Sequence, residues 1–346
     1  MGLNFPTELD DWRRWQAGQH RLQRMRARLS GTARETPTLG IAVRGAAPTV
    51  LLAIDSRSPS GIASLHGLLS RVPELAVVSC VHSPSELREL LGGEETGARI
   101  SEIDVLPDSL ALVVGAGHYL PAGAAAWMLA TRRGLPMTVV QHGLLTPFNP
   151  PLPPQAHVLA FSEAEGAFWA SGRDDVGWTV VGSQLFWDAA DASAEPAAGG
   201  VPQYLGQLHG AELPRRGMAR AASRFWHETG AVYRPHPSEV DRLSRVQHAL
   251  WERQGMRIDR SKRPLAALGG PVVAAFSTGI LEAAAAGLPS WSFYPDPPRW
   301  LAEFWERYGI RRWEVDADPT PAPARPAVEP AQAIADAVLA LAEGAS

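Results

Sequence analysis

The stretch that decides the fold is Pro271-Val272-Val273-Ala274-Ala275-Phe276-Ser277-Thr278-Gly279-Ile280-Leu281-Glu282-Ala283-Ala284-Ala285-Ala286-Gly287-Leu288-Pro289. The apolar run at residues 271–276 predicts a buried strand. The alanine-rich run that follows predicts a helix that ends at Gly287. Because a strand, a hydroxyl-rich turn and a helix follow one another, the stretch predicts an α/β protein with a ligand site at the turn.

The turn has the residues of a phosphate-binding helix start. A helix that begins at Ser277 or Thr278 leaves its first backbone N–H groups unpaired, pointing outward at the positive end of the helix dipole. Ser277 is the expected N-cap, Thr278 adds a hydroxyl, and Gly279 lets a ligand approach the backbone. Glu282 follows about 6 Å along the axis, which suits the ribose of a nucleotide. An ordinary capped core helix has the same pattern, so both interpretations stay open.

Two further strand ends are expected beside this turn. The run Ala231–Pro237 predicts a short strand that presents Arg234 and His236, which could supply positive charge to the same phosphates. The alternative for His236 is a residue that only stiffens a proline-rich turn. The strand at residues 202–206 leads into Gln207-Leu208-His209-Gly210, a small polar turn expected to touch the nucleotide, with His209 as a further candidate.

Together these motifs resemble the donor domain of GT-B glycosyltransferases. The resemblance rests on two motifs. The first is Arg234-Pro235-His236-Pro237, and the second, about 40 residues later, is a strand followed by Ser277-Thr278 and a helix with an early glutamate that ends in Gly-Leu-Pro. The chain looks most like bacterial surface-polysaccharide enzymes, polysialyltransferase-like enzymes and CDP-glycerol glycerophosphotransferases. In that group the His-Pro histidine and the Ser/Thr pair contact the phosphates of the donor. The resemblance spans about residues 135 to 295.

The resemblance implies a GT-B fold, that is, two Rossmann-like doubly wound α/β domains facing a central cleft. We expect an N-terminal amphipathic basic helix at residues 1–34, an acceptor domain at 35–190 and a nucleotide-donor domain at 191–346. The last helix of the chain is expected to cross back to the first domain, as it does in GT-B folds.

The N-terminal half offers two candidate catalytic residues. His142 follows a strand at residues 136–140, and the resemblance implies that it faces the acceptor and takes its proton as general base. A neutral imidazole suits that role, whereas the alternative is a loop histidine bonded to a backbone carbonyl. Asp55 ends a strand at 49–54, where it either binds an acceptor hydroxyl or caps the following turn.

A nicotinamide-dependent enzyme is rejected on the residues of the one candidate fingerprint. Gly115 and Gly117 are in place, but Leu120 stands where the third glycine belongs. The next strand ends in Gln141-His142, where an acidic residue would hold a ribose.

Composition limits the class of protein. A formal net charge of -4 argues against nucleic acid as partner, and a single cysteine, Cys80, excludes disulfides within the chain. No apolar run is long enough to span a membrane, so a cytoplasmic protein is expected. Residues 7–30 read as an amphipathic, arginine-rich helix. Such a helix either packs on the domain or lies at the inner face of the membrane.

These observations predict a glycosyltransferase that moves a sugar from a nucleotide-activated donor of UDP, CDP or CMP type to a glycan or lipid-linked acceptor in cell-surface polysaccharide or glycoconjugate synthesis. The donor is a substrate, and no other cofactor is expected. No Asp-X-Asp pair ends a strand, so we expect catalysis without a metal. Three alternatives stay open: a CDP-polyol phosphotransferase of teichoic-acid type, a sugar-nucleotide epimerase, and an inactive nucleotide-sugar-binding protein.

Overall fold

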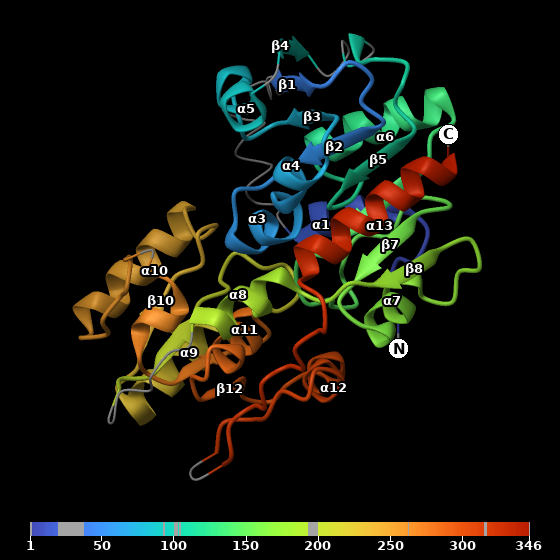
Figure 1. Cartoon of the computed structure of the whole chain (residues 1–346). Helices are drawn as coiled ribbons and strands as arrows, with labels where there is room; N and C mark the ends of the chain where they lie inside the picture. The colour runs from blue at the N-terminus through green and yellow to red at the C-terminus, as the bar shows by residue number, and fades with distance from the viewer. Residues whose placement is uncertain are drawn as a thin grey trace. The chain divides into compact units, whose positions relative to one another are not determined.

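The computed structural model describes residues 2–19, 38–92, 94–99 (backbone only), 103, 105–192, 200–261, 263–314 and 317–345. By its contacts the chain divides into two compact units, and each is described here by itself. Unit 1 is Met1–Leu185 with Pro326–Ser346, and unit 2 is Phe186–Arg325. Figure 1 shows the elements of both.

Unit 1 is built on an eight-stranded sheet with the order β4-β1-β3-β2-β5-β6-β7-β8. Its strands are β1 (Thr38–Arg44), β2 (Val50–Ile54), β3 (Leu75–Ser79), β4 (Glu94–Arg99), β5 (Leu112–Gly115), β6 (Met137–Val140), β7 (His157–Ala160) and β8 (Gly177–Val180). Its helices are α1 (Leu9–Gln19), α3 (Pro59–Leu65), α4 (Gly67–Arg71), α5 (Pro84–Leu91), α6 (Pro121–Arg133), α7 (Glu163–Ala170) and α13 (Pro330–Ala345).

Strands β2, β3 and β5 to β8 form a parallel set, and their order, β3-β2-β5-β6-β7-β8, makes a doubly wound sheet. The direction of winding reverses between β2 and β5. Each residue of β2 is buried, since the side chains alternate between two apolar layers. Leu51 and Ala53 contact the layer that contains α6, whereas Leu52 and Ile54 contact the layer that contains α13.

One edge of this sheet differs from a purely parallel arrangement. β1 runs antiparallel to both of its neighbours, β3 and β4. Only residues 45–49 join β1 to β2, and a parallel crossover needs a dozen or more residues. The short connection therefore forces β1 to run the opposite way.

The C-terminal helix α13 packs on the first unit. Ile334, Ala335 and Val338 join the apolar layer that covers β2. Glu329, just before the helix, forms an ion pair of 2.9 Å with Arg71, and the backbone N–H of Ala331 donates to the side-chain oxygen of Gln184 at 2.7 Å. The end of the chain thus completes the core of unit 1.

Unit 2 has a smaller, all-parallel sheet with the order β10-β9-β11-β12. Its strands are β9 (Gln203–Leu205), β10 (Val232–Arg234), β11 (Val272–Ala274) and β12 (Ser290–Ser292), and its helical segments are α9 (Arg215–Thr229), α10 (Arg242–Arg253), η2 (Leu265–Leu268), α11 (Gly279–Ala285) and α12 (Arg299–Arg307). Helix α8 (Gln184–Ala192) spans the division between the units. The α/β class with doubly wound parallel sheets, expected from the sequence, is confirmed.

Candidate functional site

The polar strand ends of unit 2 meet at one edge of its sheet. The chain passes from β9 outward to β10 and then returns to β11 on the other side of β9. Ligands of open α/β sheets bind at such a reversal, outside the carboxyl ends of the strands. The residues that follow β9, β10 and β11 are the turns that the sequence singles out. Topology therefore brings the three predicted motifs to one place.

Side-chain contacts join these turns. The side-chain oxygen of Gln207, after β9, accepts a hydrogen bond of 3.1 Å from the backbone N–H of Phe276, after β11. On the other side, the ring of His209 stacks on the ring of His236, with centroids 4.0 Å apart and planes at 17°. The turn after β9 thus contacts both neighbouring strand ends.

His236 carries its proton on Nε2. Its Nδ1 accepts a hydrogen bond of 3.1 Å from the backbone N–H of Ser238, which leaves Nε2 as the N–H donor of the neutral ring. Desolvation of the ring, assisted by the neighbouring His209, lowers the pKa of His236 to about 4. In this structure the imidazole of His236, an exposed residue, is therefore neutral near pH 7, and a positive charge supplied by it stays a prediction. It can offer a hydrogen bond from Nε2.

Arg234 places a positive charge at the carboxyl edge of the sheet of unit 2. Its guanidinium lies 3.5 Å from a carboxylate oxygen of Asp259 and donates a hydrogen bond to the backbone oxygen of Arg263. Only 17% of the side chain is exposed. Burial raises the pKa of Glu282 to about 7, and the charge of Arg234 opposes that rise. Arg234 and Glu282 therefore act on each other electrostatically across the end of the sheet.

The start of α11 differs from the expected phosphate cradle. The helix begins at Gly279, whose N–H donates to the hydroxyl of Ser277 at 3.1 Å. The next two N–H groups, of Ile280 and Leu281, donate to the backbone oxygens of Ser277 and Thr278. The expectation that the first N–H groups of the helix are unpaired is corrected for residues 279 and 280, because a tight first turn uses these two groups within the chain. Half-buried hydroxyl groups of Ser277 and Thr278 stay at this edge.

Gly279 serves packing in this structure. A Cβ atom at this position would lie 2.6 Å from Leu205 and 3.2 Å from Leu265. The absence of a side chain therefore lets α11 approach β9 closely. Close packing of α11 on β9 is therefore sufficient to explain a glycine at this position, and no ligand is needed to explain it.

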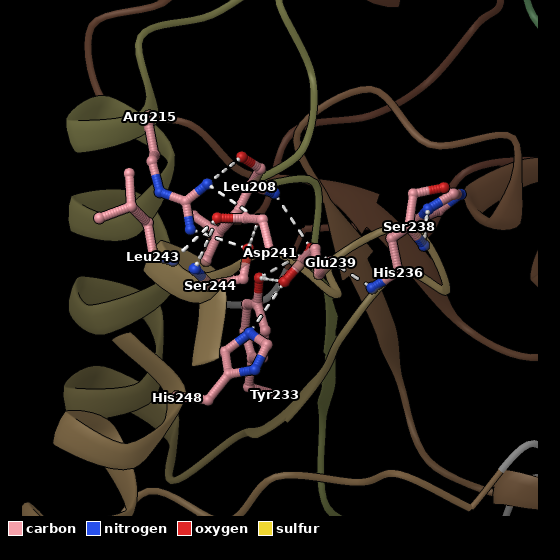
Figure 2. Close-up of polar contacts among 10 residues, drawn as sticks. All are labelled: Leu208, Arg215, Tyr233, His236, Ser238, Glu239, Asp241, Leu243, Ser244 and His248. Carbon is pink, nitrogen blue, oxygen red and sulfur yellow. Dashed lines mark hydrogen bonds and ion pairs between the residues drawn. The ribbon is translucent and has the colours of Figure 1, made fainter. Parts of the chain in front are cut away.

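Sequence reasoning missed Glu239, which is the hub of the polar network in Figure 2. This carboxyl group is fully buried and accepts hydrogen bonds from the backbone N–H groups of Leu208 and His236 and from the hydroxyl of Tyr233. Nε2 of His248, on α10, lies 2.9 Å from it. The sequence shows only a glutamate three residues after His236, and the burial of its partner His248 on α10 is seen only in the structure.

The base candidate of unit 1, His142, follows β6 in a braced loop. The side chain of Gln141 donates to the backbone oxygen of Gly143 at 3.0 Å and to Glu165, and it accepts from the N–H of Phe161 at 2.9 Å. Burial lowers the pKa of His142, while the carbonyl of Val140 opposes the change. Its imidazole is therefore neutral near pH 7, as a general base requires.

Asp55 follows β2 at the reversal of the sheet of unit 1. Its two carboxylate oxygens accept hydrogen bonds of 2.7 and 2.8 Å from the N–H groups of Ala122 and Gly123 at the start of α6, and Cys80 donates to the same carboxyl group. Burial raises the pKa of Asp55. Asp55 is thus a cap, although of a helix distant in sequence and not of the turn that follows it.

The described part of the N-terminal segment packs on unit 1. The indole N–H of Trp12 donates to the backbone oxygen of Phe148 at 2.8 Å, and Trp15 stacks on the ring of Phe148 at 5.0 Å. The apolar side of α1 is therefore used inside the unit, and the rest of the predicted helix, residues 20–30, lies outside the described residues.

The described residues contain neither a metal-binding cluster nor a membrane-spanning helix. No group of three or more His, Cys, Asp and Glu side chains among them could hold a metal ion. In the same part of the chain, no helix has the length and apolar character needed to cross a membrane.

Comparison with known proteins finds low similarity. No protein-family model matches the sequence, and no curated protein matches it. The structure is similar to UDP-GlcNAc 2-epimerase of Methanocaldococcus jannaschii in complex with UDP-GlcNAc and UDP (13% identity, 70% of this chain and 83% of that chain covered, TM-score 0.48). A second structure of that epimerase shows 10% identity, 85% and 99% coverage and a TM-score of 0.47. The glycotransferase of kitacinnamycin shows 14% identity, 86% and 94% coverage and a TM-score of 0.41.

Proposed function

We propose that this protein is a GT-B glycosyltransferase that binds a nucleotide-activated donor at the carboxyl edge of the sheet of unit 2. The observation that carries the proposal is the convergence of three strand ends at the reversal of a parallel sheet. There the stacked His209 and His236 rings and the bond from Gln207 to the turn after β11 join the predicted motifs. The acceptor would be a glycan or a lipid-linked glycan.

Charge that develops on the leaving phosphates is stabilised by Arg234 and by the Nε2–H of His236. Fixed donors aimed at a developing negative charge contribute a large part of enzymatic rate acceleration. The hydroxyls of Ser277 and Thr278 add neutral donors to the same phosphates. Glu282, one turn into α11, accepts a hydrogen bond from a ribose hydroxyl. Because Arg234 supplies the positive charge, we propose catalysis without a metal.

His142 is the proposed general base, which takes the proton of the acceptor hydroxyl. The lowered pKa keeps the imidazole in its proton-accepting form at neutral pH. Gln141 and its partners hold the loop that presents the ring.

The first test is nucleotide binding by the isolated protein. Isothermal titration with UDP, CDP, CMP and GDP should find at least one ligand, and Arg234→Gln should weaken it about 10- to 100-fold, since a charged hydrogen bond contributes about 1.5–3 kcal/mol. Arg220→Gln, which removes an exposed arginine of α9, is the matched control and should bind like wild type. Equal affinity of Arg234→Gln and wild type would refute the proposed site.

A donor panel then separates the related activities. Transfer from a nucleotide sugar to an acceptor supports the proposal. Turnover of CDP-glycerol with no sugar transfer would instead identify a CDP-polyol phosphotransferase. A product formed from the nucleotide sugar without acceptor would identify an epimerase, and binding without any turnover a nucleotide-sugar-binding protein.

A further inference from the structure

Glu239 has no role in the chemistry described above, yet it is the most connected buried carboxyl group of the site. None of its side-chain surface is exposed. Burying a carboxyl group costs free energy unless hydrogen bonds compensate it, so such a residue is retained where its bonds are needed. The hydrogen bonds of Glu239 therefore indicate which parts of unit 2 it holds in place.

The two oxygens of Glu239 serve different parts of unit 2. Oε1 accepts from the backbone N–H of Leu208 at 3.0 Å and from the backbone N–H of His236 at 3.3 Å. Oε2 accepts from the hydroxyl of Tyr233 at 2.9 Å and lies 2.9 Å from Nε2 of His248. Oε1 thus ties together the turns after β9 and β10, and it also lies 3.2 Å from the Tyr233 hydroxyl, while Oε2 anchors the carboxyl group to β10 and α10.

The two tied turns are those that carry the stacked imidazoles. Leu208 immediately precedes His209, and the second N–H belongs to His236 itself. The two rings lie face to face at 4.0 Å. Arg215 supports the same turn from the other side, because its guanidinium donates to the backbone oxygen of Leu208 at 2.8 Å while contacting Ser244 on α10 and Asp241, the N-cap of that helix. Figure 2 shows Leu208 held between Arg215 and Glu239.

We propose that Glu239 is a positioning residue of the donor site, which holds the turns after β9 and β10 in register so that His209 and His236 present their rings together to the phosphates of the donor. The assignment of a phosphate ligand rests on the proposed function. The placement of the two rings by Glu239 is independent of that function. Glu239 touches no ligand in this account and acts only through the two turns.

The substitutions Glu239→Ala and Glu239→Gln separate this role from a charge effect. Alanine removes both acceptors. Glutamine keeps one oxygen, which will face the two backbone N–H groups, because the opposite orientation would place its NH₂ against them. The NH₂ group then faces Tyr233 and His248. Glu239→Gln should therefore preserve the turns and Glu239→Ala should release them.

The decisive readout needs no ligand. In protein labelled with ¹⁵N-histidine, the imidazole signals of His209 and His236, assigned with His209→Gln and His236→Gln, report the tautomer and surroundings of each ring. Wild type should show His236 as the Nε2–H tautomer. In Glu239→Ala both signals should shift and His236 should become a tautomer mixture, whereas Glu239→Gln should resemble wild type. Ser223→Ala, which removes the 2.9 Å partner of the Trp251 indole in the same unit, controls for loss of stability and should leave both signals unchanged.

Binding of UDP, CDP, CMP and GDP is then measured on the same variants. Glu239→Ala should raise the Kd at least 10-fold, and Glu239→Gln less than 3-fold. Unchanged imidazole signals in Glu239→Ala would overturn the positioning role, as would a glutamine variant as defective as the alanine variant. If Glu239→Ala does not fold, Glu239→Asp replaces it, since the shorter side chain cannot reach both turns, and unchanged signals there would overturn the proposal equally. If wild type binds no nucleotide, the proposed function fails, and the imidazole signals still decide the role of Glu239.

Discussion

Replacement of Glu282 by glutamine should change how the stability of the protein depends on pH. The carboxyl group has an ordinary pKa of 4.5, and burial at the start of α11 raises it to about 7 in the folded state. A raised folded pKa means that folding favours the protonated form. This contribution to stability is complete below pH 4.5 and is lost as the pH rises to about 7.

The magnitude follows from the size of the change. Each pKa unit corresponds to about 1.4 kcal/mol, so the rise from 4.5 to about 7 corresponds to at most about 3.5 kcal/mol of unfolding free energy. Glutamine does not ionise, so the unfolding free energy of Glu282→Gln does not fall in this way as the pH rises. Its stability relative to wild type should therefore increase by up to about 3.5 kcal/mol between pH 4.5 and pH 8.

Urea unfolding followed by tryptophan fluorescence measures the effect at a series of pH values. Comparison of the two proteins at each pH cancels the titration of every other group. Glu306→Gln, which removes an exposed carboxyl group from α12 of the same unit, should show no such trend. If the difference in unfolding free energy between Glu282→Gln and wild type stays constant from pH 4.5 to pH 8, the claim that burial disfavours the ionised form of Glu282 is refuted.

Two further predictions concern unit 1. Asp55→Asn leaves one acceptor oxygen for the N–H groups of Ala122 and Gly123, so the unfolding free energy should fall by about 1–3 kcal/mol in urea titrations; unchanged stability would contradict the capping role. His142→Ala should lower kcat about 10²- to 10⁴-fold while the Kd for the nucleotide stays within 2-fold of wild type. Because burial lowers the pKa of His142, wild-type activity should fall only below pH 6.5, and a transfer rate unaffected by the substitution would exclude His142 as the base.

The elements of the fold could be predicted where a local pattern is strong. The run Val50–Ile54 is apolar at every position, which is typical of a strand covered on both faces, and β2 occupies these residues. The alanine-rich run after Thr278 forms α11. In contrast, the short run at residues 256–258 forms only a single bridge, between Tyr233 and Ile258. A segment of three residues carries too little pattern to decide between these outcomes.

The candidate site was predictable at the level of which turns take part and not at the level of their hydrogen bonds. Proline, glycine and hydroxyl residues after apolar runs identify strand ends, and parallel strands bring such ends to one edge. Glu239 gives no comparable signal, because the sequence does not reveal whether a glutamate in a loop is solvated or buried. Its importance comes from Leu208 and His248, which approach it only in the folded unit.

The order of residues was enough to predict the α/β class, the strand ends that carry Arg234, His236 and Ser277, and the absence of disulfides within the chain. Each of these depends on local periodicity or on composition, which the chain carries without folding. Tertiary structure alone decided that Asp55 caps α6, that the first N–H groups of α11 are already paired, and that His236 is neutral while the carboxyl group of Glu282 titrates near pH 7. These properties depend on desolvation and on partners distant in sequence, and both exist only once the chain has packed.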